Sequence, residues 1–349
     1  MWGVASSITT ADASVRAVAA AVLTLPEGTS ARVATAADLE RAIEFHNRYA
    51  RPGGWQSLDL ARRFEAANPQ PKRLWLVVED ARSDVVAVAS ASDGGHFATP
   101  DGTFQGGVRV APAWRRKGLG GALLAALEAH ARAQGTPKLR GSVRGDEPEG
   151  LVFAERRGYR EYHRRIDSYL ELQAFDPTRF EAPEAVARRT GVRLASYAEC
   201  APTQADDLER FQRELYELNR ELTGDIPRPE PLPPLPPFEA VRGMFFDPPA
   251  FDAETTILAL RDGRIVALTM TDLKPTGVAY TFMTGVARPE RGVGLALALK
   301  LRAIAGLRAK GARLFGTTND PANAPMLGIN QRLGYRPDPP SIHVEKVFA

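Results

Sequence analysis

The sequence VRVAPAWRRKGLGG at residues 108–121 has a counterpart in TGVARPERGVGLAL at residues 284–297. In both stretches the apolar end of a predicted strand leads into a turn that contains proline. The motif Arg-x-x-Gly-x-Gly/Ala then begins a predicted helix that is rich in alanine and leucine. The two stretches therefore share one plan of strand, turn and helix, and this plan decides the fold.

The spacing shows that the two stretches are copies of one unit. The arginines that begin the motif lie 176 residues apart (291 − 115), and the glycines that follow keep the same offset (294 − 118). Further on, Arg-Gly-Tyr at 157–159 and Leu-Gly-Tyr at 333–335 are also 176 residues apart (334 − 158). About 45 residues thus run in register without a gap, which indicates an internal repeat. The chain is predicted to contain two copies of one domain.

The loop of each copy has the features of an anion-binding site. A helix N-terminus leaves its first N–H groups unpaired and carries the positive end of the helix dipole. Glycines let the backbone approach a ligand closely, so the loop can form a cradle for phosphate. Positive charge is added by Arg115, Arg116 and Lys117 in the first copy and by Arg288 and Arg291 in the second.

Two common phosphate-binding motifs do not match this loop. A P-loop continues with Gly-Lys-Ser/Thr, which neither copy has, and a dinucleotide-binding motif has Gly or Ala where the copies have Leu123 and Leu299. The Arg-x-x-Gly-x-Gly/Ala form between a strand and a helix resembles the acetyl-CoA pyrophosphate loop of the GNAT family of N-acetyltransferases. Each half resembles this family over about 150 residues. The layout is similar to that of tandem GNAT enzymes such as mycothiol synthase.

The resemblance implies a fold and a set of boundaries. Each half is expected to be an α/β (α+β) domain, a bent mixed sheet flanked by helices, with coenzyme A in a V between two central strands. We expect an N-terminal extension at 1–28, a GNAT-like domain at 29–172, a connector at 173–190 and a second GNAT domain at 191–349. The first domain is expected to be degenerate, structural or a weaker site. Residues 164–172 and 342–348 are predicted to be the last strands of their own domains.

The composition is that of an ordinary globular chain, with 349 residues, 44% hydrophobic and 25% charged. A net charge of +3 is too small to indicate a nucleic-acid partner. No apolar run approaches roughly 18 residues, so no membrane span is expected. The single cysteine, Cys200, and the five scattered histidines predict neither a disulfide framework nor a metal site, and a cytoplasmic location is expected. We expect a monomer or homodimer.

The resemblance also implies which residues hold acetyl-CoA. The strand before each loop would bind the pantetheine arm through its main chain, and the loop would bind the diphosphate. In the second copy these residues are Thr284, Gly285, Val286, Arg291, Gly292, Val293, Gly294, Leu295 and Ala296, together with Asn319 and Asn323. In the first copy the weaker set is Val108, Val110, Arg115, Arg116, Lys117, Gly118, Leu119, Gly120 and Gly121.

The two copies differ where GNAT members carry an asparagine. The second copy has Asn323 there, with Asn319 just upstream, whereas the first copy has Glu147, whose carboxylate would repel the phosphates of the coenzyme. The second copy is therefore predicted to be the functional coenzyme site. The alternative is that the two asparagines only cap the helix that follows Pro321.

The acid and base of the reaction are harder to assign. Many GNAT members have a tyrosine four residues before the closing glycine to protonate the thiolate, but the copies have Ala154 and Asn330 there. Asn330 could hydrogen-bond the thiol, and Tyr280 or Tyr335 could replace the missing acid. Asp272 is a candidate base for the amine, with Asp225, Glu239, Asp93 and His96 as alternatives. The catalytic candidates are therefore Asn330, Tyr280 and Asp272.

These features predict an acetyl-CoA-dependent N-acetyltransferase that acts on a small primary amine by direct transfer. Two other classes remain open. The chain could bind coenzyme A as a sensor or scaffold without turnover, which the missing tyrosine favours. It could also capture a protein partner through its proline-rich residues 223–238, which in the GNAT fold would instead roof the acceptor site.

Overall fold

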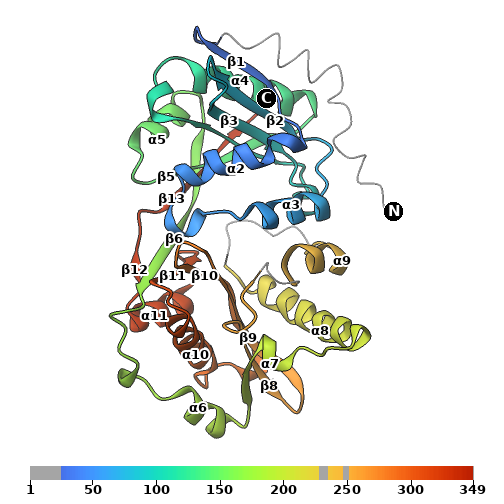
Figure 1. Ribbon diagram of the computed structural model, residues 1–349, viewed down its shortest axis with the longest axis vertical. Helices are drawn as coiled ribbons and strands as arrows, with labels where there is room; N and C mark the ends of the chain where they lie inside the picture. Colours follow the sequence, from blue (N-terminus) through green and yellow to red (C-terminus); the bar gives the residue numbers. More distant parts are fainter. Residues whose placement is uncertain (1–24, 228–234, 247–250, 349) are drawn as a thin grey trace.

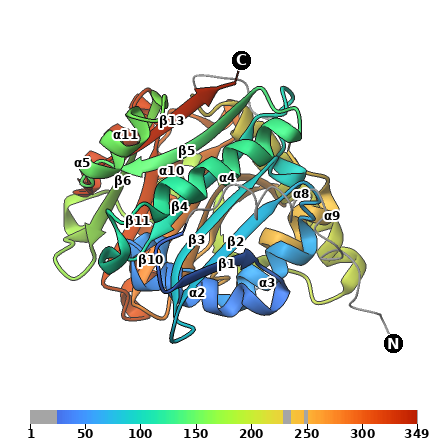
Figure 2. The same ribbon diagram turned by 90° about the horizontal axis from the view of Figure 1, so that it is seen from above.

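The computed structural model describes residues 25–227, 235–246 and 251–348, which form two bodies stacked along the long axis of the molecule (Figure 1). The upper body is built mostly from the N-terminal half of the chain and the lower body mostly from the C-terminal half. Each body is a sheet with helices packed on it. Figure 2 shows α4 on one face of the upper sheet and α2 with α3 on the other.

The N-terminal half runs from β1 to β6. Its strands are β1 (Thr29–Val33), β2 (Leu74–Asp80), β3 (Val85–Ser92), β4 (Phe104–Val110), β5 (Lys138–Arg144) and β6 (Arg160–Glu171). Its α-helices are α2 (Leu39–Arg48), α3 (Leu58–Ala67), α4 (Leu119–Ala133) and α5 (Pro148–Glu155). Its 3-10 helices are η1 (Ala36–Asp38), η2 (Pro52–Gly54), η3 (Gly95–Phe97) and η4 (Pro112–Trp114).

A connector with η5 (Pro177–Arg179) and α6 (Pro183–Thr190) leads to the C-terminal half. The strands there are β7 (Arg193–Ser196), β8 (Ile257–Arg261), β9 (Arg264–Leu273), β10 (Val278–Val286), β11 (Leu314–Asn319), β12 (Arg336–Pro337) and β13 (Ser341–Val347). The helices are α7 (Tyr197–Cys200), α8 (Ala205–Gly224), α9 (Phe238–Val241), η6 (Arg242–Phe246), η7 (Arg288–Glu290), α10 (Leu295–Ala309) and α11 (Ala324–Leu333). The two halves therefore repeat one order of elements.

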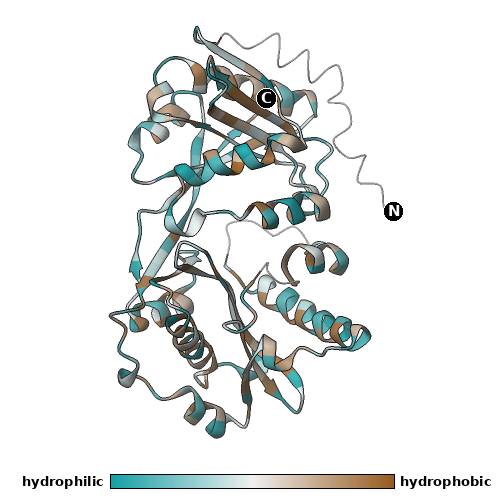
Figure 3. Ribbon diagram, in the orientation of Figure 1, coloured by the Kyte–Doolittle hydropathy of each residue, from teal (hydrophilic) through white to brown (hydrophobic). Residues whose placement is uncertain are grey.

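Helical spacing of apolar residues accounts for the long helices. In α4 the residues at helical spacing, Leu119, Leu123, Leu127 and Ala131, are all buried against the upper sheet. In α8 the buried residues Leu215, Leu218 and Leu222 form one stripe, while charged residues cover the other side (Figure 3). Burial of these stripes fixes the faces that the helices turn toward the two sheets.

The strands form one continuous order across both halves, β1-β2-β3-β4-β5-β13-β6-β11-β10-β9-β8-β7. All neighbours on this path are antiparallel except two pairs, β4–β5 and β10–β11, which are parallel. The parallel pairs are the two strands that flank each loop motif, so each pair forms the centre of one copy.

Each parallel pair opens into a V. Strands β4 and β5 pair only at Phe104–Leu139 and Gln105–Arg140 before they diverge. Strands β10 and β11 pair from Val278–Leu314 to Thr281–Thr317, and β10 then carries a bulge that shifts its register against β9. The expected V between two central strands is therefore present in both copies, with its apex where pairing ends.

The two halves exchange their last strands. Strand β13, near the C-terminus, pairs with β5 and with residues 160–165 of β6, so it belongs to the upper sheet. Residues 166–171 of β6 pair with β11 in the lower sheet. Figure 1 shows β6 running from the upper body into the lower one and β13 rising back.

The expectation that 164–172 and 342–348 complete their own domains is therefore wrong for these two strands. A repeat offset reports the order of elements along the chain but not their pairing partners. Strand β6 has 12 residues and continues through both sheets. Because proline cannot donate a ladder hydrogen bond, Pro337, Pro339 and Pro340 end β12 and release the chain toward the upper sheet.

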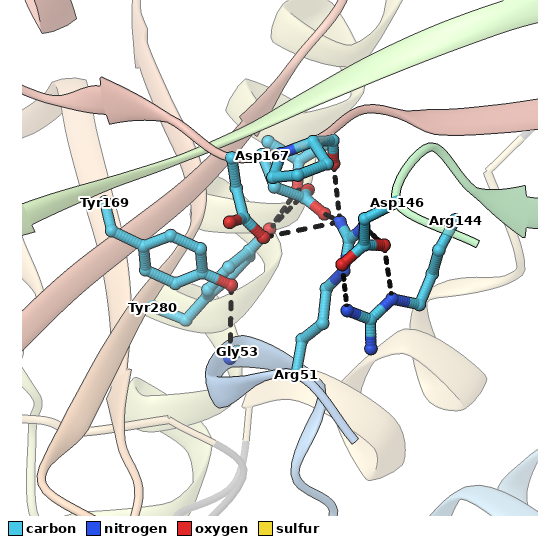
Figure 4. Close-up of polar contacts among 10 residues, drawn as sticks. Arg51, Gly53, Arg144, Asp146, Asp167, Tyr169 and Tyr280 are labelled. Atoms are coloured by element: carbon cyan, nitrogen blue, oxygen red, sulfur yellow. Dashed lines mark hydrogen bonds and ion pairs between the residues drawn. The ribbon is translucent and has the colours of Figure 1, made fainter. Parts of the chain in front are cut away.

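Arg51 holds the crossing together (Figure 4). Its guanidinium lies 3.2 Å from Asp146 Oδ1 in the loop after β5 and 3.3 Å from Asp167 Oδ2 on β6. It also donates to the carbonyl of Pro339, at 2.7 Å, on the way to β13. The Arg51 side chain is only 10% exposed, so one buried cation links the first half to both exchanged strands.

Candidate active site

The two motif loops have the same local geometry. The main chain takes positive φ at Arg116 (62°) and Gly118 (89°) in the first copy, and at Gly292 (84°) and Gly294 (93°) in the second. In both copies the motif arginine donates from Nε to the last carbonyl of the preceding strand, Arg115 to Val110 at 3.2 Å and Arg291 to Val286 at 2.9 Å. Gly118 and Gly294 are the N-caps of α4 and α10, so the first N–H groups of both helices face their loops.

The first V holds a large cavity, which we call the N-terminal cavity. Its volume is about 930 Å³, and it runs from the apex of β4 and β5 to the loop at the start of α4. The apex is lined by Gly106, Gly107, Leu139 and Gly141, and the loop by Arg115, Arg116, Gly118 and Gly120. A Cβ on Gly141 would lie 2.8 Å from the carbonyl oxygen of Gly106, so glycine is needed where the two strands meet.

The N-terminal cavity is rich in arginine. Arg109, Arg115, Arg116, Arg144, Arg156 and Arg157 line it, against the two carboxylates Glu147 and Glu149. Glu147 lies 3.8 Å from Arg115, so part of its charge is compensated. The volume, the excess of cations and the glycine loop fit a long ligand with several phosphates, such as coenzyme A.

A second cavity of about 420 Å³ lies between the two halves, and we call it the inter-half cavity. From the C-terminal half it is lined by the apex of β10 and β11 and by the residues after it, including Thr284, Asn319, Asp320 and Asn323. From the N-terminal half it is lined by Gln105, Arg140 and Tyr162, and by His163 and Arg165 of β6. The exchanged strand β13 contributes His343.

Side chains at matched positions explain why the second V is narrower. Residues 176 positions apart are counterparts along the repeat, and at four positions that line the N-terminal cavity the first copy has glycine where the second has a larger side chain. Gly106, Gly107, Gly141 and Gly150 of the N-terminal cavity correspond to Phe282, Met283, Thr317 and Met326. Leu124 and Leu139 likewise correspond to Lys300 and Phe315, which are fully buried.

The predicted coenzyme residues of the second copy are divided between two places. Thr284, Asn319 and Asn323 line the inter-half cavity, while the loop residues 291–296 lie outside it. Between them Leu222 of α8 packs on Gly285, where a Cβ would lie 2.5 Å from a Leu222 methyl group. The structure therefore brings together the apex and the asparagines but not the apex and the loop.

Asp225 at the end of α8 binds both arginines of the second loop. Its carboxylate oxygens lie 2.5 Å from Arg288 Nη2 and 2.5 Å from Arg291 Nη2. Hydrogen bonds from Arg288 and then Arg291 hold the pKa of Asp225 well below its usual range. The candidate base Asp225 is thus a fixed anion that compensates the charge of this loop.

The three predicted catalytic residues are not brought into either cavity. Asn330 is buried and donates to Asn319 Oδ1 at 2.7 Å. Tyr280 hydrogen-bonds Thr318, and burial raises its pKa. Burial also raises the pKa of Asp272, whose carboxylate lies 3.3 Å from Lys274 Nζ. Asn330 therefore positions another asparagine, and Tyr280 and Asp272 belong to the sheet interior.

The other candidate residues and the proline-rich segment lie in different parts of the structure. Asn323 accepts from the N–H of Met326 and caps α11, so its capping role is present, although the residue also lines the inter-half cavity. Glu239, Asp93 and His96 line neither cavity. Of the proline-rich segment, Ile226 and Pro227 line the inter-half cavity, as a roof would, and residues 228–234 lie outside the described part of the chain.

Sequence reasoning missed a histidine–carboxylate pair in the inter-half cavity. His163 Nε2 of β6 lies 3.1 Å from Asp320 Oδ2, which follows β11. No motif marks His163, because it reaches the second copy only through the exchanged strands. The sequence does mark Asp320 in one way. Its counterpart 176 residues earlier is Arg144, so the charge at this position is reversed between the copies.

The described residues contain no group of three or more His, Cys, Asp or Glu side chains that could hold a metal ion. None of the helices described is long and apolar enough to cross a membrane.

Comparisons with known proteins agree with this geometry. A sequence model of the Acetyltransferase (GNAT) family matches residues 29–159. The mycothiol acetyltransferase of Thermomonospora curvata is 26% identical over 320 residues, which cover 85% of this chain and 94% of that protein.

Two solved structures share the fold over nearly the whole chain. A GCN5-related N-acetyltransferase from Sphaerobacter thermophilus has a TM-score of 0.65 and 21% identity, with 93% of this chain and 97% of that chain covered. A tandem GNAT protein from the clavulanic acid biosynthesis pathway has a TM-score of 0.68 and 19% identity, with 91% and 98% covered. Residues 29–159 thus match the GNAT family, the whole chain has the fold of tandem GNAT proteins, and these similarities support a tandem GNAT acetyltransferase that uses acetyl-CoA.

Proposed function

We propose that the chain acetylates a small primary amine and that the transfer takes place at the V of the second copy, in the inter-half cavity. The coenzyme supplies an activated acetyl thioester when bound. The protein must then position the amine, accept its proton and stabilise the charge that develops on the carbonyl oxygen. The observation that carries the proposal is the lining of the inter-half cavity. It places the apex of β10 and β11 beside His163, Asp320 and the two asparagines Asn319 and Asn323.

The apex of the N-terminal cavity has no comparable set. Its lining there is glycine and leucine, and its carboxylates Glu147 and Glu149 lie at the start of α5. A proton acceptor has to be within hydrogen-bond reach of the proton that it removes. We therefore assign to the N-terminal cavity the binding of a second coenzyme molecule without turnover.

In the second copy, the residues of the chain have separate tasks. The bulge in β10, between Thr281 and Met283, interrupts the pairing with β9 beside the V, where a main-chain N–H group would donate to the thioester carbonyl. Asn319, held by Asn330, presents its amide side chain to the same cavity. The N-terminus of α10, with Gly292 and Gly294, provides N–H donors for a diphosphate, and Leu222, which packs on Gly285 between this loop and the apex, has to move for one coenzyme molecule to reach both.

A matched pair of loop substitutions tests the assignment. Gly294→Glu and Gly118→Glu place a carboxylate at equivalent helix N-caps, and both replace glycine at nearly the same positive φ (93° and 89°). The backbone strain is therefore similar, although a Cβ on Gly294 lies 3.6 Å from Arg189 Nη2 and nothing lies within 4 Å of one on Gly118. We expect Gly294→Glu to abolish amine-dependent thiol release. Gly118→Glu should lower the number of coenzyme molecules bound per chain, with a far smaller loss of turnover.

Thiol release over a panel of amines and calorimetric titration with coenzyme A are the two measurements. If Gly118→Glu is the variant that loses turnover, the roles of the two copies are reversed. If the unmodified protein binds the coenzyme but releases no thiol with any amine, the chain is a coenzyme sensor and the proposal fails. Thermal unfolding of both variants shows whether the fold is retained.

A further inference from the structure

The inter-half cavity contains a polar pair built from both halves of the chain. His163 lies on β6 and Asp320 follows β11, and their side chains are only 18% and 9% exposed. The carboxylate is held in place, because Asp320 Oδ1 also accepts from the N–H of Ala322 at 2.8 Å. Resting on the function proposed above, we propose that His163 is the proton acceptor for the acceptor amine and that this amine also carries a carboxylate, which Arg165 binds.

The geometry of the pair gives His163 a defined protonation pattern. A neutral imidazole has one N–H donor and one acceptor nitrogen. With Nε2 3.1 Å from the Asp320 carboxylate, the N–H belongs on Nε2, and Nδ1 keeps the lone pair. The same carboxylate stabilises the imidazolium that forms when Nδ1 takes a proton. Asp320 is therefore a positioning residue and His163 is the base.

The other charged and titratable groups around His163 leave it as the available base. His343 of β13 stacks at 5.7 Å between ring centroids, and burial, together with the nearby Arg165 and His163, lowers its pKa to about 4. His343 is thus neutral at physiological pH. Tyr162 precedes His163 on β6, and Arg140 of β5 is bound to Glu345 at 2.9 Å.

Arg165 gives the cavity a preference for anions. Residues two apart on a strand point to the same face, so Arg165 lies beside His163, with about 6–7 Å between their Cα atoms. Both residues line the inter-half cavity, and Arg165 has no ion-pair partner within the described ranges. Asp320 is the one carboxylate among the lining residues and already faces His163.

The anion is a carboxylate and not a phosphate. A single guanidinium offers one planar fork, which matches the two oxygens of one carboxylate. The second arginine of the cavity, Arg140, is already compensated by Glu345, so a phosphate dianion would remain only half neutralised. An amino acid or a short amino-terminated acid has the required pair of groups.

The reaction step balances with the groups present. The ammonium group of the acceptor gives one proton to His163 Nδ1, and its lone pair then forms the C–N bond to the acetyl carbon. The C–S bond of the thioester breaks and the thiolate leaves, since its pKa of about 8.5 makes it a tolerable leaving group at neutral pH. The nitrogen, which still carries one proton more than an amide does, releases that proton to solvent, and the thiolate takes up one proton from solvent. His163 returns its proton to solvent, and no oxidant or metal is required.

The test uses 4-aminobutyrate and n-butylamine, which have the same chain length but differ by the carboxylate. Arg165→Ala is expected to lower kcat/KM for 4-aminobutyrate at least tenfold, through KM, and to change n-butylamine less than threefold. Arg164→Ala is the matched control, because Arg164 is the neighbouring residue on the opposite face of β6 and pairs with Glu161. It should leave both amines unchanged.

His163→Gln tests the base. We expect kcat to fall about 100-fold or more with both amines, while the calorimetric affinity for 4-aminobutyrate stays within threefold. Asp320→Asn alone should lower kcat less than His163→Gln does. Adding Asp320→Asn to His163→Gln should restore none of the lost kcat. The proposal is overturned if Arg165→Ala affects the two amines equally, or if His163→Gln keeps near-normal kcat.

Binding measurements separate this proposal from the proposed function. If the unmodified protein acetylates neither probe, it does not transfer acetyl groups to such amines, and the proposed function fails for them. Titration with 4-aminobutyrate in the presence of coenzyme A then still tests whether Arg165 binds the carboxylate. Loss of that binding in Arg165→Ala but not in Arg164→Ala supports an anion-selective acceptor pocket. Equal binding of both probes by the unmodified protein contradicts it.

Discussion

The V between β4 and β5 and the V between β10 and β11 come from one repeated plan but have specialised in different directions. The first is wide, open from apex to loop and rich in arginine, with about 930 Å³ of space. The second is narrower, and its space of about 420 Å³ is surrounded by histidine, carboxylate and amide side chains from both halves. The comparison shows that space for a coenzyme molecule and side chains that could take part in catalysis are separate properties of this fold.

Side chains at matched positions account for part of this difference, because the two loops keep the same backbone geometry, and the bulge that β10 carries and β4 lacks adds to it. Both loops keep positive φ at the same two positions and the same arginine-to-carbonyl hydrogen bond. The first copy keeps glycine where the second has Phe282, Met283, Thr317 and Met326. The exchange of β6 and β13 then brings His163 and His343 to the second V and none of the equivalent groups to the first.

Filling the wide V is expected to have the largest effect on this comparison. Gly107→Met copies the residue of the second V, Met283, and nothing lies within 4 Å of the Cβ that it adds. The side chain should occupy the N-terminal cavity near its apex without straining the sheet. We expect calorimetry with coenzyme A to lose one binding event per chain.

The control is Gly224→Met at the end of α8, where an added Cβ also has open space, φ is not positive, and the residue lies in neither cavity. It should keep the original stoichiometry. A Gly107→Met protein that still binds as many coenzyme molecules as the unmodified chain would show that the wide V is not a coenzyme groove.

The fold could be predicted from the sequence because it follows from local signals. The repeated segment of about 45 residues, the glycines at the N-caps and the apolar spacing in α4 and α10 are each contained within a few tens of residues. Pairing partners are not local, so the strand exchange could not be read from the repeat. The bridge from the largely buried Arg51 to Asp146 and Asp167 joins residues about a hundred positions apart and had no sequence signal either.

Replacement of the buried lysine of the second copy, Lys300, is expected to have the next largest effect. Lys300 of α10 is fully buried, with its Nζ 4.9 Å from the Tyr335 ring and 5.4 Å from the Phe315 ring, and the described residues offer it no hydrogen bond. The first copy has Leu124 at this position. Lys300→Leu should therefore raise the free energy of unfolding by about 1–3 kcal/mol, the typical cost of an unsatisfied buried polar group.

The pH dependence gives this prediction its sign. Burial lowers the pKa of Lys300 from 10.5 to about 7. Between these values the unfolded chain binds more protons than the folded one, so the stability of the unmodified protein rises with pH. The gain from Lys300→Leu should be full at pH 7 and below and shrink toward pH 10. A gain that stays constant over this range in urea denaturation would contradict the assignment.

The candidate site could be predicted only in part, for the same reason as the fold. Asn319 and Asn323 were found because the repeat compares them directly with the first copy. Tyr280 and Asp272 were chosen by residue type, but they lie on β10 and β9, where burial perturbs the pKa of both. Asn330 was chosen by its position four residues before the closing glycine, but it is buried on α11 and bonds Asn319. His163 lies in the first half of the chain and acts beside the second V only because β6 crosses between the bodies.

The smallest expected effect separates the two loops by charge. Asp225 neutralises Arg288 and Arg291, whereas the first loop has only Glu147, 3.8 Å from Arg115. These pairs are exposed, so their strength is limited and sensitive to salt. Asp225→Asn should tighten coenzyme binding at the second loop severalfold at low ionic strength, with the difference fading as salt is added. Glu217→Gln, which removes an exposed carboxylate of the same helix that pairs with Arg220, should change nothing. If Asp225→Asn instead weakens coenzyme binding, the main role of Asp225 is to hold Arg288 and Arg291 in the positions where they bind phosphate. Neutralising the charge of the two arginines is then its lesser role.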